Sequence, residues 1–426
     1  MLKQKLIAKI KLAVLAVLIT GTSLYASKSV GQTQTSPQTL VDEVWQILNQ
    51  NYVDGSFNHQ DWKAIRQQYL SHKYSSKQQA YTGIREMVAK LGDRYTSFFD
   101  PQEFKALNSD LSGNLSGVGL QLAENEKTQA LTVVAPIEGT PAFKAGILPN
   151  DVIVQINNQP TKGLKIDEAV KRILGPVGTK VLLTIQRGQQ AQTFKLTRAN
   201  IAIHPVTYNT QTTSTGKIGY IRLPEFTQTA AAEMHQAIQA LEKQQVQGYV
   251  LDLRADPGGL LDASLQIASM WLKQGAIVSL VNRDQVKNSY NATGHPLTNK
   301  PLVILVNQGS ASASEILAGA LQDDNRAKLV GTRTFGKGLV QAVQPLEDGS
   351  ALKVTIAKYY TPKGRDINHV GITPDIKVEL TEAQQKALQE NHSAGTLADP
   401  QYASAVASLS QLIQTGANSV GLESGK

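Results

Sequence analysis

The sequence predicts a multi-domain α/β protein in which a helical domain, a compact α+β domain and a larger α/β domain follow one another. Apolar residues recur at helical spacing in residues 39–108. Short β-type runs broken by glycine follow in residues 109–199, and apolar strands alternate with helices in residues 200–380. A chain of 426 residues with 41% hydrophobic content has enough material for two or three domains, each with its own core.

Residues 1–31 have the composition of a secretory signal peptide. Four lysines and no acid precede the apolar run 12–19, and small or polar residues follow it. The run is shorter than the roughly 20 residues that a membrane-spanning helix needs, which favours a cleaved signal over a permanent anchor. Cleavage is expected near Ser29-Val30-Gly31, with Ala26 as the alternative, and residues 32–38 form a polar linker. We therefore expect an exported protein.

The composition excludes several kinds of site. The chain has no cysteine, so it can form neither a disulfide nor a zinc–thiolate site. The formal net charge is +8, but residues 1–31 supply five lysines and no carboxylate, which leaves about +3 for the rest of the chain. Neither a basic stripe with interleaved aromatic residues nor a metal-ligand spacing such as H-E-x-x-H occurs. We expect no nucleic acid, no metal and no other cofactor.

Individual elements follow from the apolar spacing. In the α+β domain, strands are expected at 117–122, 131–134, 151–156 and 181–185, with a helix at 167–174. In the α/β domain, strands are expected at 250–253, 302–306, 328–331 and 352–360, with helices at 260–272 and 315–322. Continuous apolar strands followed by helices indicate a buried, partly parallel sheet. Residues 381–426 form a tail with weak helical patterning and no assigned role.

The candidate nucleophile lies in a loop of small residues. None of the seven histidines lies in a triad motif and no G-x-S-x-G occurs, so the sequence does not support a conventional serine triad. Residues 307–315, Asn-Gln-Gly-Ser-Ala-Ser-Ala-Ser-Glu, connect a buried strand to a helix. A serine at this junction lies near helix N–H groups that favour developing negative charge. The competing interpretation is that Ser314 is only the N-cap of that helix.

The candidate base is Lys337, which lies between Gly336 and Gly338. A lysine acts as a general base only when it is neutral, and burial lowers its pKa towards that state. Flanking glycines permit the close packing that such burial needs. The competing interpretation is an ordinary exposed lysine in a turn. Taken together, the serine at the junction and the lysine between glycines predict a nucleophile and its base.

These motifs resemble those of the carboxyl-terminal processing (tail-specific) proteases, and the resemblance extends over about residues 40–380. Its most specific parts are residues 91–98, Asp252-Leu253-Arg254 with Pro257-Gly258-Gly259, residues 309–315 and residues 334–341. The resemblance implies a serine endopeptidase with an α/β core of the crotonase-like type.

By the same resemblance, Ser312 is the nucleophile, Lys337 is the base and Gln341 orients the lysine. A four-residue step would bring Gln341 beside Lys337 if this segment is helical. The oxyanion donors are expected to be the backbone N–H groups of Gly258 and Ala313. These placements are physically sensible, since Gly258 permits a close approach and Ala313 follows the nucleophile at the helix entry.

The middle domain resembles a PDZ domain. The backbone N–H groups of Gly117, Val118, Gly119 and Leu120 match the loop that receives a terminal carboxylate, and a bound tail would add a strand beside residues 120–122. Many members of the family carry arginine immediately before the Gly-Pro-x-Gly that ends the PDZ helix, where this chain has Leu174. The departure leaves open whether the domain only captures tails or also gates the active site.

The resemblance also implies partners and a location. The expected substrates are proteins with free C-terminal tails, including a photosystem II reaction-centre precursor, in a periplasm or a thylakoid lumen. A non-catalytic PDZ adaptor is the main alternative, but it leaves Ser312, Lys337 and Gln341 unexplained together. A trypsin-like PDZ protease would need a His/Asp/Ser set and G-x-S-G-G, and neither is present. The sequence does not indicate an oligomeric state.

Overall fold

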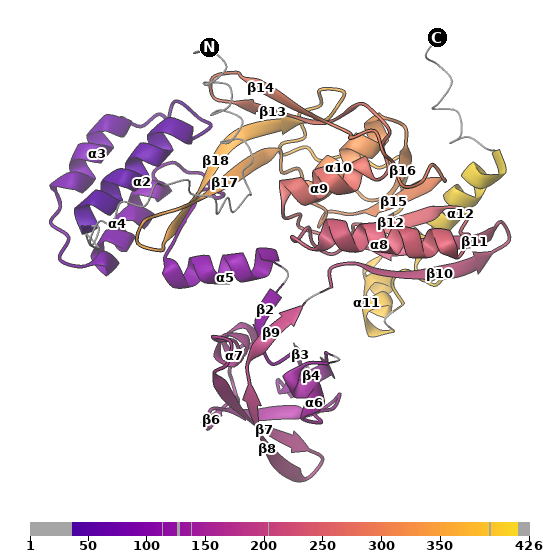
Figure 1. The fold of residues 1–426 in the computed structure, drawn as a ribbon, viewed down its shortest axis with the longest axis horizontal. Coiled ribbons are helices and arrows are strands. Elements are labelled where there is room, and N and C mark those ends of the chain that lie inside the picture. The colour runs from indigo at the N-terminus through magenta and orange to yellow at the C-terminus, as the bar shows by residue number, and fades with distance from the viewer. Residues whose placement is uncertain are drawn as a thin grey trace. The chain divides into compact units, whose positions relative to one another are not determined.

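The computed structural model describes residues 36–112, 114–125, 128–137, 139–202, 204–391 and 393–415. The expected signal peptide and residues 32–35 of the linker lie outside these ranges. The chain divides into two compact units (Figure 1): a smaller one of residues 108–203, and a larger one formed by the residues before and after it. Within the described residues, no helix has the length and apolar character that a membrane crossing requires.

The larger unit begins with the helices α2 (Pro37–Asn51), α3 (Trp62–Ser71) and α4 (Lys77–Ala89), and it includes α5 (Pro101–Ser112) up to residue 107. Ser36, Asp61 and Ser76 precede the first three, and each accepts a hydrogen bond from an N–H of the first turn. Buried residues of α2, α3 and α4 share one core with Leu352 and Val354 of β18 (Ala351–Tyr360). The helical segment is therefore part of the larger unit rather than a separate body.

A first sheet of this unit is built around β18. Its strand order is β1 (Ser97–Phe99), β18, β13 (Ala276–Asn282) and β14 (Lys287–Asn291), and β17 (Leu339–Pro345) also pairs with β18. All of these pairings are antiparallel. Strand β1 begins directly after residues 91–96, and β17 begins two residues after Lys337. Because both strands pair with β18, residues 91–96 and Lys337 are brought to the same sheet.

A second sheet forms the buried centre of the larger unit. Its order is β10 (Thr207–Thr213), β11 (Gly216–Arg222), β12 (Tyr249–Asp252), β15 (Leu302–Val306), β16 (Ala327–Gly331) and β19 (Ile376–Lys377). Only β10 is antiparallel to its neighbour, and every residue of β12 and β15 is buried. The expected partly parallel, buried sheet is confirmed.

Three helices connect the parallel strands: α8 (Ala230–Lys243), α9 (Leu261–Ser269) and α10 (Ala313–Asp323). Because neighbouring parallel strands point the same way, the loops that leave β12 and β15 lie at one edge of the sheet. These are the loops that carry Gly258 and Ser312.

The C-terminal segment contradicts the expectation of a tail without a role. Helices α11 (Glu382–Glu390) and α12 (Pro400–Thr415) form there, and Figure 1 shows α12 beside β12 and β15. Tyr402, Ala405 and Leu409 are buried in one cluster with Val250 and Val303. The sequence pattern was weak because this buried face is narrow and the rest of α12 is small or polar.

The main sheet of the smaller unit has five strands in sequence across it, and β3 is the strand at one edge. Its elements are β2 (Asn114–Gly117), β3 (Leu120–Glu124), β4 (Leu131–Pro136), α6 (Pro141–Lys144), β5 (Val152–Ile156), β6 (Gln159–Pro160), α7 (Ile166–Ile173), β7 (Lys180–Arg187), β8 (Gln190–Thr197) and β9 (Ala199–Ala202). The order is β3-β4-β5-β7-β8, with β6 paired to β5. Within the described residues, the outer edge of β3 is therefore available for a further strand.

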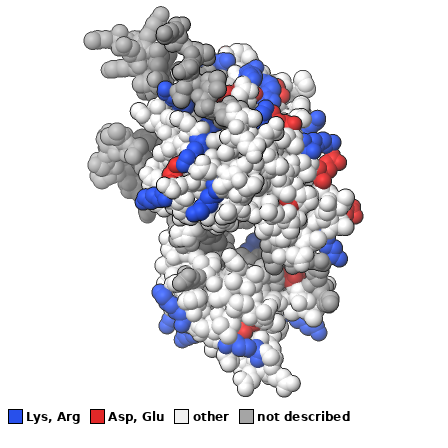
Figure 2. Space-filling model, turned by 90° about the vertical axis from the view of Figure 1, so that its right-hand side faces the viewer, with Lys and Arg blue, Asp and Glu red and all other residues white. Residues whose placement is uncertain are grey.

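Charged side chains are dispersed over the surface in Figure 2. On the face shown there, lysines and arginines stand singly or in small groups that uncharged residues separate. This face carries no continuous basic stripe.

Candidate active site

Ser312 lies at a strained turn between β15 and α10. Its φ of 55° and ψ of −112° fall in a region that residues with a side chain rarely adopt. Its carbonyl oxygen accepts from the Ile316 N–H at 2.9 Å and from the Tyr359 hydroxyl at 3.2 Å, which holds the turn in place. Ser312 itself is only half-buried, so its side chain is accessible.

The two neighbouring serines are buried and serve the loop instead. Ser310 Oγ donates to the Leu253 carbonyl at 2.7 Å, and Ser314 Oγ donates to the Asp256 carbonyl at 3.0 Å. Helix α10 begins at Ala313 with Ser312 as its N-cap residue, so the interpretation of Ser314 as the N-cap is wrong. Among the three serines, only Ser312 can meet a substrate.

Lys337 packs closely because of the glycines on both sides. A Cβ on Gly336, whose φ is +88°, would lie 2.8 Å from the Gly371 nitrogen, and one on Gly338 would lie 2.9 Å from the Asn368 nitrogen. The pKa of Lys337 is lowered to about 8, chiefly by burial and to a smaller extent by the nearby charge of Lys353. The alternative of an exposed turn lysine does not fit this half-buried residue.

One carboxylate, that of Glu315, connects the loops that carry Ser312 and Lys337. Its Oε2 accepts from the N–H of Ser312 at 3.0 Å and from the N–H of Lys337 at 2.9 Å. Its Oε1 accepts from the Thr334 hydroxyl at 2.5 Å and from the Gly336 N–H at 2.8 Å. The backbone N–H groups of Ser312 and Lys337 thus donate to the same oxygen atom of Glu315.

The sequence analysis quoted Glu315 within a motif but gave it no role. The available signal was the spacing Ser312-x-x-Glu315, which is that of a capping box at a helix N-terminus. That pattern predicts the bond from Glu315 to the Ser312 N–H. It gives no hint of the bonds to residues 334–337, because these lie some twenty positions further along the chain.

The Lys337 side chain points to an aromatic ring in this structure. Its Nζ lies 4.9 Å from the centre of the Tyr95 ring, a cation–π distance. Within the part of the chain that the structure describes, no hydrogen bond joins Ser312 Oγ to Lys337 Nζ. The two side chains are therefore not paired in this structure, and catalytic hydrogen bonds often tighten only when substrate binds.

Gln341 is not placed as the helical spacing suggested. It lies in strand β17, at a register irregularity between Val340 and Gln341, and is buried. Its Nε2 donates to Thr355 Oγ1 at 3.4 Å, and Thr355 Oγ1 donates to Asp93 Oδ2 at 2.6 Å. The sequence left open whether this segment is helical, and pairing with β18 makes residues 339–345 a strand.

The backbone of Gly258 lies directly beside Ser312. Its φ is +103°, and a Cβ there would lie 2.9 Å from the Ala313 nitrogen and 2.9 Å from Ser312 Cβ. Gly258 and Ala313, whose N–H groups are the expected oxyanion donors, therefore lie next to each other. In this structure, however, the Gly258 N–H donates to Asp256 Oδ1 at 2.8 Å.

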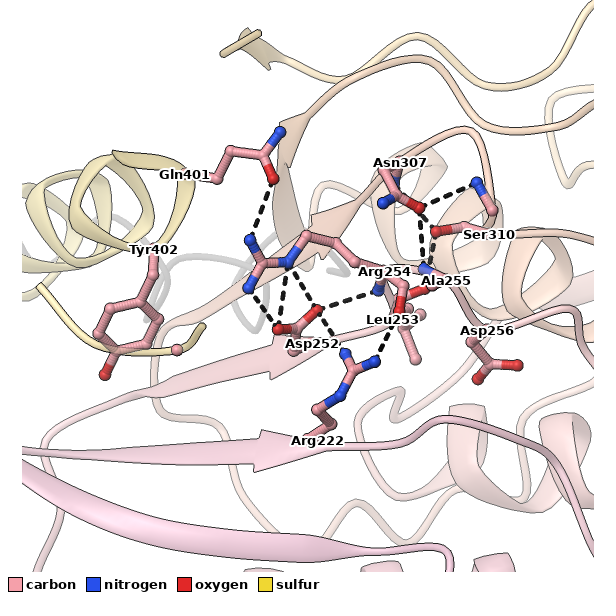
Figure 3. A network of polar contacts seen from close by, with 12 residues as sticks. Arg222, Asp252, Leu253, Arg254, Ala255, Asp256, Asn307, Ser310, Gln401 and Tyr402 are labelled. Atoms are coloured by element: carbon pink, nitrogen blue, oxygen red, sulfur yellow. Dashed lines mark hydrogen bonds and ion pairs between the residues drawn. The ribbon is translucent and has the colours of Figure 1, made fainter. Parts of the chain in front are cut away.

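A buried ionic network anchors the start of this glycine loop (Figure 3). Arg254 donates to Asp252 Oδ2 at 2.6 Å, and its Nη1 lies 2.7 Å from Asp399 Oδ2 and 3.0 Å from Gln401 Oε1. Burial by itself would raise the pKa of Asp252, but the bonds from Arg254 hold that pKa below its ordinary value. The C-terminal segment thus fixes the strand end that leads to Gly258.

The smaller unit contains an apolar groove between β3 and α7. Its lining residues are Gly117, Val118, Gly119, Leu120, Leu122, Ile137, Val170, Ile173, Leu174 and Ile201. Gly119 has a φ of +78°, and a Cβ there would lie 2.3 Å from Thr140 Cβ, so only glycine fits this turn. The four residues of the expected carboxylate loop are all among the residues that line the groove.

Comparison with known proteins gives the family. The model of Peptidase family S41 matches residues 217–378, that of the PDZ domain residues 132–187, and that of the Tricorn protease C1 domain residues 35–72. The carboxyl-terminal-processing protease of Synechocystis sp. is 45% identical over 348 residues, covering 81% of this chain and 82% of that one. The protein of the same name from Picosynechococcus sp. is 46% identical, covering 80% and 83%.

A solved structure agrees with these relatives. A photosystem II D1 C-terminal processing protease is 36% identical, with a TM-score of 0.57, and the match covers 86% of this chain and all of that one. The chain belongs to the carboxyl-terminal-processing protease family and is a serine-type peptidase with a PDZ domain.

Proposed function

We propose that this protein is an exported endopeptidase that processes the C-terminal tails of proteins, with Ser312 as nucleophile and Lys337 as base. The observation that carries the proposal is the Glu315 carboxylate, which binds the backbone N–H groups of both residues. A carboxylate that is shared in this way fixes the distance between a nucleophile and its base. The similarity to a photosystem II D1 processing protease supports a reaction-centre precursor as one substrate, in a thylakoid lumen or periplasm.

The remaining roles in the proposed mechanism follow from placement. The N–H groups of Gly258 and Ala313 would receive the oxyanion, since both lie beside Ser312. Gln341 would act on the base through Thr355 and Asp93 rather than by direct contact. The core with its parallel strands β11, β12, β15 and β16 would be of the crotonase-like type, and no metal or cofactor takes part.

The PDZ domain would capture the tail. A carboxylate would sit on the N–H groups of Gly117, Val118, Gly119 and Leu120, and the tail would pair with the free edge of β3. The groove beside this loop is lined by aliphatic side chains, so a tail that ends in an apolar residue fits best.

Substrate tails with a free carboxylate should be cleaved much faster than amidated ones. A charge-assisted hydrogen bond contributes about 1.5–3 kcal/mol, and a neutral amide cannot replace it. Amidation, or one charged residue added after the apolar terminus, should lower kcat/KM by about ten-fold or more. Matched peptides assayed with the intact enzyme measure this, and equal cleavage of acid and amide would refute tail recognition.

A substitution in the groove tests the same site from the side of the enzyme. Val170 on α7 lines the groove, whereas its neighbour Lys171 is exposed. Val170→Asp and Lys171→Gln change the net charge equally, but only the first places a negative charge beside the bound carboxylate. Val170→Asp should raise KM about ten-fold and leave kcat unchanged if the domain only captures tails. A parallel loss of kcat would show that the domain also gates the active site.

The rate should rise with pH as Lys337 loses its proton. The pKa of Lys337 is lowered to about 8, so the neutral, active form grows as the pH increases through that value. Lys353→Gln removes a positive charge that helps to lower this pKa, and should therefore move the rise to higher pH, by about half a unit. Lys358→Gln, on the exposed face of the same strand, is the control. A rise that stays in place in Lys353→Gln would assign it to another group.

A further inference from the structure

The carboxyl group of Asp256 is buried beside the proposed oxyanion donor with only half of its hydrogen-bonding capacity used. The residue has no exposed surface, and its Oδ1 accepts the Gly258 N–H at 2.8 Å. Its Oδ2 is buried without a hydrogen-bond partner among the described residues. In Figure 3 its side chain turns away from the Asp252–Arg254 pair. Ionising such a carboxyl is costly, because one oxygen receives no compensation for lost water.

Hydrogen bonds hold the backbone around Asp256 in place, so a change of protonation affects only the contacts of its carboxyl group. The Asp256 carbonyl accepts from the Ala311 N–H at 2.9 Å and from Ser314 Oγ at 3.0 Å. These bonds clamp the loop of Gly258 onto the loop of Ser312. A change in the protonation of Asp256 therefore acts mainly on its bond with the Gly258 N–H.

We propose that Asp256 is a positioning residue that opens and closes the oxyanion hole: as a carboxylate it holds the Gly258 N–H, and as a neutral acid it releases this N–H to the scissile carbonyl. The proposal rests on the proposed function, in which Gly258 is an oxyanion donor. A carboxylate is a much stronger acceptor than a neutral acid. Its negative charge beside Gly258 also opposes the charge that develops on the oxyanion.

The surroundings of Asp256 place this change near pH 8. Burial raises the pKa of Asp256 to about 8; the Gly258 N–H, the Ser314 hydroxyl and the charge of Arg222 oppose the rise, and the charge of Glu225 adds to it. The Ser314 hydroxyl donates to the main-chain carbonyl of Asp256, which leaves Oδ2 without a partner among the described residues. Below that pH the group is neutral and the donor is free, and above it the group is charged and the donor is held. The rate should thus fall as pH rises through the pKa of Asp256, opposite to the effect of Lys337.

The decisive experiment compares the pH profiles of wild type and Asp256→Asn. Asparagine has nearly the same shape and stays neutral, so it represents the open state at every pH. The variant should keep the rise due to Lys337 and lose the fall at high pH. At about pH 9.5 its kcat should exceed that of the wild type by about ten-fold, with KM unchanged, because an oxyanion donor acts in the transition state.

A second variant tests the proposal without touching Asp256. Glu225→Gln removes a negative charge that raises the pKa of Asp256, so the fall should begin at lower pH. Glu379→Gln, which removes an exposed carboxylate elsewhere in the larger unit, should leave the profile unchanged. If Asp256→Asn does not fold, as judged by its thermal unfolding, Glu225→Gln decides.

Three outcomes would overturn the proposal. They are a wild-type profile without a fall, a fall that persists in Asp256→Asn, and an Asp256→Asn profile lowered equally at every pH, which marks a purely structural role. A failure of the proposed function has a different signature, namely residual activity in Ser312→Ala or labelling of another serine by an active-site-directed probe.

Discussion

Ser312→Ala and Lys337→Ala are each expected to abolish peptide-bond hydrolysis while the fold stays intact. The two side chains act as one unit, so removing either should lower kcat by at least about 10³-fold, and the double variant should be no worse than either single one. The hydrogen bonds that join the two loops through Glu315 come from the backbone N–H groups of Ser312 and Lys337, so both alanine variants retain them. Turnover of a tail peptide and thermal unfolding measure the two effects.

The neighbouring serines provide matched controls for this expectation. Ser310→Ala and Ser314→Ala delete the same hydroxyl group within two positions of Ser312, but from buried side chains that bond to carbonyls of the glycine loop. Each should cost about 1 kcal/mol of stability and leave most of the activity. Near wild-type turnover in Lys337→Ala at neutral pH would contradict the assignment of the base and direct the search to a histidine.

Glu315→Gln is expected to cause the second largest loss. The carboxylate accepts four hydrogen bonds with two oxygen atoms, whereas a glutamine side chain would present an NH₂ group to one pair of these donors. Buried donors left without an acceptor cost about 1–3 kcal/mol each. We expect kcat to fall by about 10²-fold or more, because the loops of Ser312 and Lys337 lose their common anchor.

The Glu315 variant needs a control on the same helix. Asp324→Asn, at the exposed end of α10, makes the same chemical change away from the site and should be nearly neutral. The loss in Glu315→Gln should appear in kcat with KM little changed, together with a lower unfolding temperature. Full activity in Glu315→Gln would show that the shared carboxylate does not position the two residues.

Local sequence determined most of the elements correctly. The strand and helix periods placed β15 and α10, and the continuous apolar runs predicted the buried, partly parallel sheet. The loop around Ser312 could be recognised from the sequence, because the strand before it, its small residues and the helix after it are all neighbours along the chain. Glycines beside Lys337 carried a local signal too, since only a residue without a side chain fits the close contacts found there.

The sequence failed where a distant partner decides the conformation. The sequence left open whether residues 337–341 are helical, and only the pairing with β18 makes Gln341 part of a strand. The C-terminal segment seemed to have no role, yet Asp399 and Gln401 bind Arg254 from nearly 150 positions away. Hydrogen bonds and ion pairs of this kind depend on which loops meet, and no periodicity records that.

The sequence by itself determined the family resemblance, the PDZ-like module and, through that resemblance, the choice of Ser312 and Lys337. Only the tertiary structure showed that Ser312 is the accessible one of the three closely spaced serines, because accessibility and the strained φ of Ser312 arise from packing against the rest of the larger unit. The tertiary structure also revealed the common carboxylate of Glu315 and the contact of Asp256 with the Gly258 N–H. Local periodicity reflects the backbone and its nearest neighbours, whereas a catalytic site is assembled from loops that meet only after folding.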